Sequence, residues 1–116
     1  MILACPLNPQ THRLVDGAAL RALKPHARLV NVARGEVVDE VALVEALVAG
    51  HLAGAFLDVF ALEPLASASP LWGLPGVIVT PHSAGHAAGN AARVAAIFVD
   101  NLRRWLQDQP LQNAID

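Results

Sequence analysis

The chain has 116 residues, which is about the length of one ordinary domain. Hydrophobic residues make up 54 % of it and charged residues 16 %, so the composition predicts a buried core and excludes a disordered chain. Eight Lys and Arg residues against ten Asp and Glu residues give a net charge of −2, which argues against nucleic acid as the main partner.

Cysteine content and hydropathy limit the cellular compartments in which the protein can be expected. The chain has one cysteine, Cys5, so it forms no internal disulfide, which is typical of a reducing compartment. No apolar stretch approaches the roughly 20 residues of a membrane-spanning helix, because charged residues and prolines interrupt every candidate. We therefore expect a cytoplasmic protein that does not use a membrane.

The first third of the chain predicts two strands with a helix between them. A short apolar run at residues 2–5 predicts a strand, and its place directly at the start of the sequence suggests a strand from the middle of a sheet. Asp16 is a favourable N-cap for a helix that continues to Leu23. Residues 28–32 predict the second strand.

The next segment completes a repeating unit of strand, helix and strand. Asp39 caps a predicted helix with apolar residues at helical spacing, and Gly50 ends it. The nearly continuous apolar run at residues 53–59 predicts a strand that is buried on both faces. This βαβ pattern favours a parallel sheet.

A long loop, a short strand and a long helix follow. Residues 60–76 contain three prolines and no periodicity, and loops of this length in α/β proteins are usually functional. Residues 77–80 predict a fourth strand, residues 90–107 the longest helix, and residues 110–116 an irregular tail. The apolar stripe of the helix comprises Val94, Ile97, Phe98, Leu102, Trp105 and Leu106.

Polar residues of three chemical kinds follow three of the predicted strands. Arg34 follows the strand at residues 28–32, Asp58 and Glu63 follow the third strand, and His82 directly follows the fourth. Because ligands of open α/β sheets bind outside the carboxyl ends of the strands, we expect these groups to converge on one edge.

These groups fit the proton-coupled reduction of a carbonyl group that lies beside a carboxylate. A guanidinium binds a carboxylate through two hydrogen bonds and polarises the adjacent carbonyl. An imidazole passes a proton near neutral pH, and a neighbouring carboxylate orients the ring and favours its charged form. No side chain supplies a hydride, so this chemistry needs a cofactor.

Each of these residues also has a purely structural interpretation. Arg34 could lie in an exposed turn, Glu63 could be a solvated loop acid, and His82 could bond to backbone at a strand end. His82 and His86 have the spacing of a helical metal pair, but a glycine lies between them and no third ligand joins them, so we predict no metal site. Cys5 has no neighbouring base and could simply pack at the end of its strand.

A series of motifs runs along essentially the whole chain. In order, they are Cys5-Pro6-Leu7 with Thr11, Asn31-Val32-Ala33-Arg34-Gly35, Val38-Asp39-Glu40, Leu57-Asp58-Val59-Phe60, Glu63-Pro64-Leu65, Ser69-Pro70-Leu71-Trp72 and Thr80-Pro81-His82. The series resembles the D-isomer-specific 2-hydroxyacid dehydrogenases, the family of the glyoxylate/hydroxypyruvate reductases and phosphoglycerate dehydrogenases. The resemblance implies an α/β fold: the second half of a Rossmann-like parallel sheet with flanking helices and a long C-terminal helix.

The resemblance also implies a role for each matching residue. Arg34 would bind the carboxylate and carbonyl oxygen of the substrate, His82 would be the acid/base and Glu63 its partner carboxylate. Asp58 would approach the nicotinamide ring. The remaining cofactor-lining residues would be Cys5, Pro6, Thr11, Val32 and Ala33. The family reduces 2-keto acids or oxidises D-2-hydroxy acids with NAD or NADP.

The resemblance covers only part of a family member. The 116 residues contain no Gly-x-Gly-x-x-Gly motif, which is the main phosphate-binding loop, and amount to about a third of a two-domain enzyme. We expect residues 1–86 to be the C-terminal part of the NAD(P)-binding domain, and residues 87–116 to return toward a substrate domain.

These considerations leave two hypotheses. The first is a truncated dehydrogenase fragment that does not turn over alone and would form a family-type homodimer at full length. The second is a non-catalytic relic that binds a full-length subunit or another partner. Intact Arg34, Glu63 and His82 argue mildly against the second hypothesis.

Overall fold

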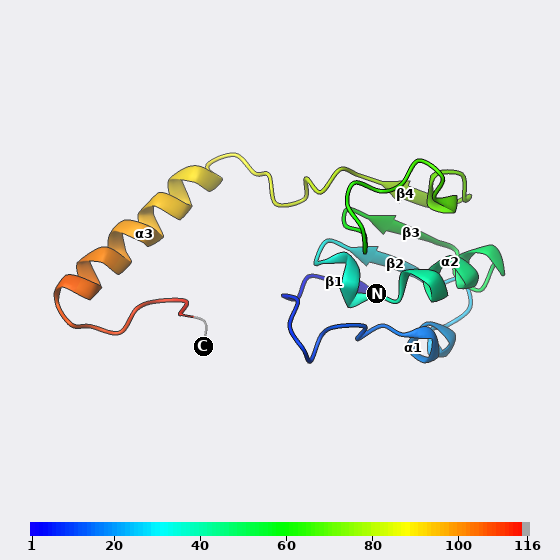
Figure 1. Cartoon of the computed structure of the whole chain (residues 1–116), viewed down its shortest axis with the longest axis horizontal. Helices are drawn as coiled ribbons and strands as arrows, with labels where there is room; N and C mark the ends of the chain where they lie inside the picture. Colours follow the sequence, from blue (N-terminus) through cyan, green and yellow to red (C-terminus); the bar gives the residue numbers. More distant parts are fainter. Residues whose placement is uncertain (115–116) are drawn as a thin grey trace. The chain divides into compact units, whose positions relative to one another are not determined.

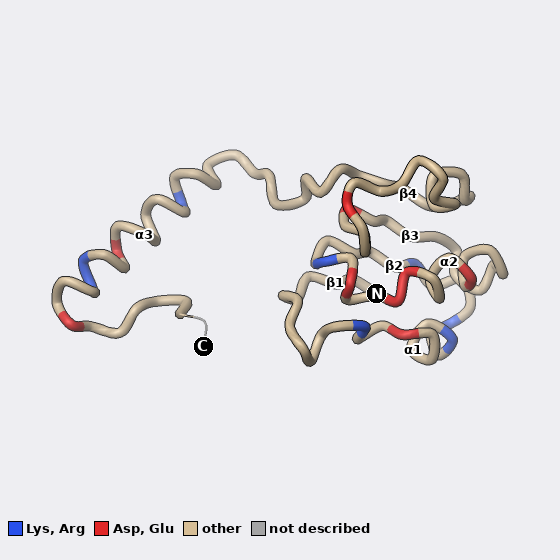
Figure 2. Tube along the Cα trace, viewed as in Figure 1, with Lys and Arg blue, Asp and Glu red and all other residues tan. Residues whose placement is uncertain are grey.

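The computed structural model describes residues 1–114, and the chain divides into two compact units, Met1–Ala84 and Gly85–Asp116 (Figure 1). Figure 2 shows Lys and Arg interspersed with Asp and Glu along the trace. That the division after Ala84 marks the end of a cofactor-binding domain stays a prediction.

The first unit is built on a parallel sheet whose strands lie side by side in chain order. They are β1 (Ile2–Leu3), β2 (Arg28–Asn31), β3 (Gly54–Leu57) and β4 (Val77–Val79), and each pairs in parallel with the next (Figure 1). The predicted α/β class with a parallel sheet is therefore confirmed. Each strand is shorter than predicted, and side-chain hydrogen bonds mark the carboxyl ends of β2 and β4. At the end of β2, for example, the Asn31 side chain bonds the backbone of the next residues.

Two helices begin after the predicted N-caps. Helix α1 (Gly17–Ala22) follows Asp16, and helix α2 (Glu40–Val48) follows Asp39; each aspartate accepts a backbone N–H from three residues further on. A side-chain acceptor at this position satisfies an amide that has no partner within the helix. Gly50, with φ of +69°, follows α2 in the left-handed conformation that glycine adopts without strain.

Two short 3₁₀ helices were not predicted. The first, η1 (Gly35–Val37), directly follows Arg34. The second, η2 (Pro70–Trp72), lies inside the long loop after β3. Ser69 caps η2 by accepting the backbone N–H of Leu71. The predicted loop thus contains an ordered turn, which returns the chain to β4.

The core of this unit lies between the sheet and helices α1 and α2. It includes Leu3, Leu20, Leu29, Val37, Leu43, Leu47, Ala55, Leu57 and Leu71. The alternate strand residues form a second row, in which Ile2 pairs with Val30, Val30 with Phe56, and Phe56 with Ile78. Because successive side chains of a strand point to opposite faces, this apolar row (Ile2, Val30, Phe56, Ile78) lies on the other face of the sheet. Ile2 is 73 % exposed and Ile78 is 58 % exposed.

The second unit contains one helix, α3 (Asn90–Leu106), which confirms the predicted long C-terminal helix. The Arg104 Nε donates to the Asp100 Oδ2 at 2.9 Å, and the predicted apolar stripe is exposed. The tail after the helix is irregular as predicted over residues 110–114, while residues 115 and 116 lie outside the described residues. No helix of the described residues is long and apolar enough to cross a membrane.

Candidate active site

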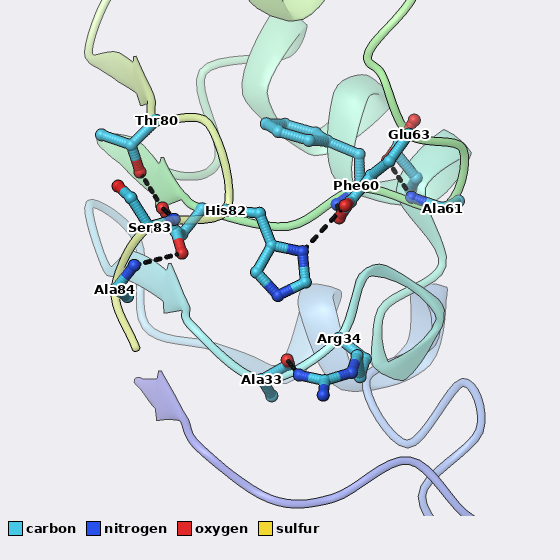
Figure 3. A network of polar contacts seen from close by, with 11 residues as sticks. Ala33, Arg34, Phe60, Ala61, Glu63, Thr80, His82, Ser83 and Ala84 are labelled. Carbon is cyan, nitrogen blue, oxygen red and sulfur yellow. Dashed lines mark hydrogen bonds and ion pairs between the residues drawn. The ribbon is translucent and has the colours of Figure 1, made fainter. Parts of the chain in front are cut away.

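The loop after β3 and the turn after β4 bring Glu63 and His82 together. The Nδ1 atom of His82 lies 2.8 Å from the Oε2 atom of Glu63 (Figure 3). The other carboxylate oxygen, Oε1, accepts the backbone N–H of Phe60 at 3.0 Å. Both oxygens therefore have a donor, which fixes the orientation of the carboxylate toward the imidazole ring.

The electrostatics of this pair favour an ionised Glu63. The hydrogen bond from His82 lowers the pKa of the Glu63 carboxyl; partial burial raises it less, and the Phe60 amide and the charge of Arg34 lower it further. Because a carboxylate can only accept hydrogen bonds, the hydrogen between the two groups belongs to Nδ1 of His82. The second ring nitrogen is then free for another partner. The side chains of His82 and Glu63 are 43 % and 36 % exposed, so the pair is open to solvent and to ligands.

Arg34 lies beside this pair, after the carboxyl end of β2. Figure 3 shows its guanidinium on the side of the His82 ring that faces away from Glu63. Its Nη1 donates to the backbone carbonyl of Ala33 at 2.6 Å, and Arg34 as a whole is exposed. The structure thus brings together the three residues that were predicted to be catalytic.

Asn31 positions the backbone of Ala33 and Arg34, a role that was not predicted from the sequence. This side chain is only 1 % exposed. Its Nδ2 donates to the carbonyl of Arg34 at 3.0 Å, and its Oδ1 accepts the N–H of Ala33 at 3.0 Å. The signal was present, because Asn31 opens the motif that contains Arg34.

Asp58 holds the turn that carries His82. Its carboxylate is 1 % exposed and accepts the hydroxyl of Thr80 and the backbone N–H groups of Ser83 and Ala84, at 2.9 and 2.8 Å for the two amides (Figure 3). His82, between these donors, has φ of +52°, in the left-handed region. Three donors from both sides of His82 therefore converge on one buried carboxylate.

The same contacts keep Asp58 ionised. Burial raises the pKa of the Asp58 carboxyl, but the hydrogen bonds from Thr80, Ala84 and Ser83 and the charge of His82 outweigh it, so this pKa lies below its ordinary value. The role predicted for Asp58, contact with a nicotinamide ring, stays a prediction, since its known partners are all within the protein.

Four of the six residues predicted to contact a cofactor (Cys5, Pro6, Val32 and Ala33) meet at the carboxyl ends of β1 and β2. A hollow of about 390 Å³ is lined there by Ala4, Cys5, Pro6, Leu7, Val32, Ala33 and Arg34. Its lining exposes both polar and apolar atoms and includes one cation, Arg34, which fits one part of a dinucleotide, whose flat rings and charged phosphates need both. Thr11 is not among the lining residues; its hydroxyl donates to the carbonyl of Pro6 at 2.7 Å and accepts the N–H of Asn8 at 2.8 Å, which closes the loop after β1.

A second hollow adjoins the acid–base pair. It measures about 550 Å³, and its lining includes Glu63 and His82 among apolar side chains that include Phe60, Leu65 and Trp72. Over residues 1–114 no group of three His, Cys, Asp or Glu side chains is close enough to hold a metal ion. The prediction that the protein holds no metal site stays a prediction.

Comparison with known proteins identifies a common family. The family model described as D-isomer specific 2-hydroxyacid dehydrogenase, NAD binding domain, matches residues 1–84. The chain is 49 % identical over 104 residues to the (S)-sulfolactate dehydrogenase of Chromohalobacter salexigens, a match that covers 90 % of this chain and 34 % of that protein. It is 42 % identical over 116 residues to the glyoxylate/hydroxypyruvate reductase B of Pectobacterium carotovorum, which covers the whole chain and 36 % of that protein. The chain thus spans about a third of the length of these curated relatives.

Solved structures agree with these matches. A D-isomer specific 2-hydroxyacid dehydrogenase from Xanthobacter autotrophicus, in complex with NADPH and MES, is 45 % identical with a TM-score of 0.92, over 99 % of this chain and 47 % of that chain. An NADPH-dependent glyoxylate/hydroxypyruvate reductase from Sinorhizobium meliloti, in complex with NADP and sulfate, is 32 % identical with a TM-score of 0.88, over 99 % of this chain and 37 % of that chain.

Proposed function

The chain belongs to the D-isomer specific 2-hydroxyacid dehydrogenase family, and we propose that it carries the acid–base and carboxylate-binding groups of an NAD(P)-dependent 2-keto acid reductase. The single observation that carries the proposal is the ordered pair of His82 Nδ1 and Glu63 Oε2 at 2.8 Å, with Arg34 on the opposite side of the ring. A hydride acceptor with a carboxylate beside a carbonyl group matches this set of donors.

Each residue has one task in this reaction. Arg34 binds the substrate carboxylate and polarises the adjacent carbonyl oxygen. The second ring nitrogen of His82 gives its proton to that oxygen as the carbonyl carbon is reduced. Ionised Glu63 holds Nδ1 of His82 and stabilises the charged ring before the proton is given up. A bound NADH or NADPH would supply the hydride, held in part by Cys5, Pro6, Val32 and Ala33.

The proposal extends to the substrates, domain roles, location and assembly of the complete enzyme. The substrates are small 2-keto acids of the glyoxylate and hydroxypyruvate class, as in the names of the relatives. Residues 1–86 complete a cofactor domain, and residues 87–116 lead toward a substrate domain. The complete enzyme acts in the cytoplasm as a family-type homodimer and has no nucleic acid partner. No comparison supports the alternative of a non-catalytic relic, since the named relatives are enzymes.

The proposal is tested by restoring what the 116 residues lack. In a chimera, the chain replaces the matching third of the Pectobacterium reductase, to which it is 42 % identical over its whole length. Oxidation of NADH and NADPH is then measured with glyoxylate and hydroxypyruvate, for the chimera and for the 116-residue chain alone. We expect turnover by the chimera and none by the chain alone, because acid–base groups act only on bound substrate and cofactor. A chimera that binds NADPH without turning over either acid would overturn the proposal.

A further inference from the structure

The backbone at Gly35, which directly follows Arg34, touches the backbone at the start of the loop that carries Glu63. A Cβ atom on Gly35 would lie 1.9 Å from the carbonyl carbon of Phe60 and 2.3 Å from the nitrogen of Ala61. Only a glycine allows this approach. The peptide between Phe60 and Ala61 therefore lies directly against Gly35. Phe60 is three positions before Glu63 in the chain.

Two carboxylates bind the two successive amides at this contact. The N–H of Phe60 donates to Oε1 of Glu63 at 3.0 Å, and the next N–H, of Ala61, donates to Oε2 of Glu40 at 2.9 Å. Glu40 is the first residue of α2 and is partly buried. Asp39 already caps that helix, so the Glu40 side chain is available to reach out to a segment 21 residues further along the chain.

We propose that Glu40 is a positioning residue, which acts on His82 through Glu63. By holding the Ala61 amide, Glu40 fixes the peptide whose neighbouring amide holds Oε1 of Glu63. Oε2 of Glu63 is then left facing Nδ1 of His82. Without Glu40 the Ala61 amide bonds to water instead, and the start of the loop gains rotational freedom. The hydrogen bond between the Glu63 carboxylate and the His82 ring is then formed in a smaller fraction of the molecules. The significance of this contact for catalysis rests on the proposed function.

The test uses the tautomer of the His82 ring in the full 116-residue chain. Nitrogen shifts in long-range proton–nitrogen spectra distinguish a ring protonated on Nδ1 from one protonated on Nε2. They are recorded at a pH at which the same spectra show a neutral His82 ring. We expect the Nδ1–H form to dominate in the unmodified chain. In Glu40→Ala the ratio of Nδ1–H to Nε2–H forms falls roughly 3- to 10-fold, the factor expected for weakening about one hydrogen bond.

Two further variants separate the contact from the charge of Glu40. Glu40→Gln keeps an oxygen that accepts the Ala61 amide, so it retains the ratio of the unmodified chain. Glu40→Asp keeps the negative charge at the start of α2 but is one methylene too short, so it behaves like Glu40→Ala. Glu40→Gln and Glu40→Asp together test the positioning role of Glu40 even where Glu40→Ala fails to fold. Glu45→Ala is the control, because this exposed glutamate of the same helix makes no side-chain hydrogen bond within the described residues.

An unchanged ratio in Glu40→Ala, or in Glu40→Asp, overturns the inference. So does a Glu40→Gln variant that loses the Nδ1–H form, because the charge rather than the accepted hydrogen bond would then be responsible. The readout needs neither cofactor nor substrate. A ratio that responds to Glu40 in a chain whose chimera is inactive would thus refute the proposed function and leave the positioning contact intact.

Discussion

At the scale of single residues, the backbone under His82 is the feature that most needs an explanation. A bulky residue with φ of +52° persists only where its surroundings hold it. Asp58 provides that hold with a buried carboxylate, which accepts donors from both sides of His82. The position of His82 next to Glu63 therefore depends on a residue that need not touch a substrate.

Replacing this carboxylate by a carboxamide tests its role in the turn. In Asp58→Asn one oxygen becomes an amide N–H₂ that faces a backbone donor, so one of the amides of Ser83 and Ala84 is left without an acceptor. We expect the free energy of unfolding to fall by about 1–3 kcal/mol in urea titrations. Asp16→Asn is the control, because asparagine caps a helix about as well as aspartate. Equal stabilities of the two variants would contradict this role.

The lowered pKa of Asp58 also predicts how stability depends on pH. A carboxyl whose pKa is lower in the folded than in the unfolded chain stabilises the fold above its unfolded pKa, at about pH 4. Below that pH the unfolded state binds the proton more readily, so this stabilisation is lost as the pH falls through the folded pKa. We expect a shallower acid slope for Asp58→Asn in urea titrations from neutral to acid pH. A slope identical to that of the unmodified chain would show that Asp58 titrates normally.

At the level of helices and strands, the sequence predicts those elements whose positions depend on neighbouring residues alone. The N-caps Asp16 and Asp39 and the apolar runs locate α1, α2 and all the strands of the sheet, because capping and periodicity are properties of neighbouring residues. The parallel order follows from the βαβ pattern, and it places Arg34, Glu63 and His82 at one edge.

The contacts that complete the site lie beyond such rules. Asp58 meets amides that are 25 and 26 residues away, and Glu40 meets one that is 21 residues away. A sequence shows which side chains could accept hydrogen bonds, but not where distant backbone N–H groups will point. This is why Glu40 received no role from the sequence and Asp58 received only the one implied by resemblance. The contacts of Asn31 are different, because they reach residues only two and three positions away and their signal was present in the motif.

The approach of η1 to the loop after β3 gives a prediction at this scale. In Gly35→Ala the added methyl group overlaps backbone atoms of Phe60 and Ala61, which cannot move without displacing Glu63. We expect a loss of about 1–3 kcal/mol in the free energy of unfolding. Gly73→Ala is the matched control, because no atom lies within 4 Å of its Cβ position and its φ of −107° suits any residue. Equal stabilities of these two variants would refute the close approach.

At the scale of the whole molecule, the high apolar content has a structural explanation. Parallel sheets of α/β proteins normally bury both faces. In the first unit, helices α1 and α2 pack on one face, while the apolar row Ile2, Val30, Phe56 and Ile78 lies on the other, with both end residues exposed. The stripe of α3 is exposed as well. Part of the 54 % hydrophobic content therefore lies on surfaces rather than in the core.

The proposed function assigns proton transfer to His82, which lies in this third of a family member. It is tested most directly by His82→Asn in the chimera, with His12→Asn, an exposed histidine of the loop after β1, as the control. We predict that kcat for glyoxylate and hydroxypyruvate falls by roughly 10²- to 10⁴-fold in His82→Asn, while NADPH binding, followed by fluorescence titration, is unchanged. His12→Asn should keep the kcat of the chimera. A His82→Asn chimera that keeps its kcat within about twofold would show that His82 does not transfer the proton.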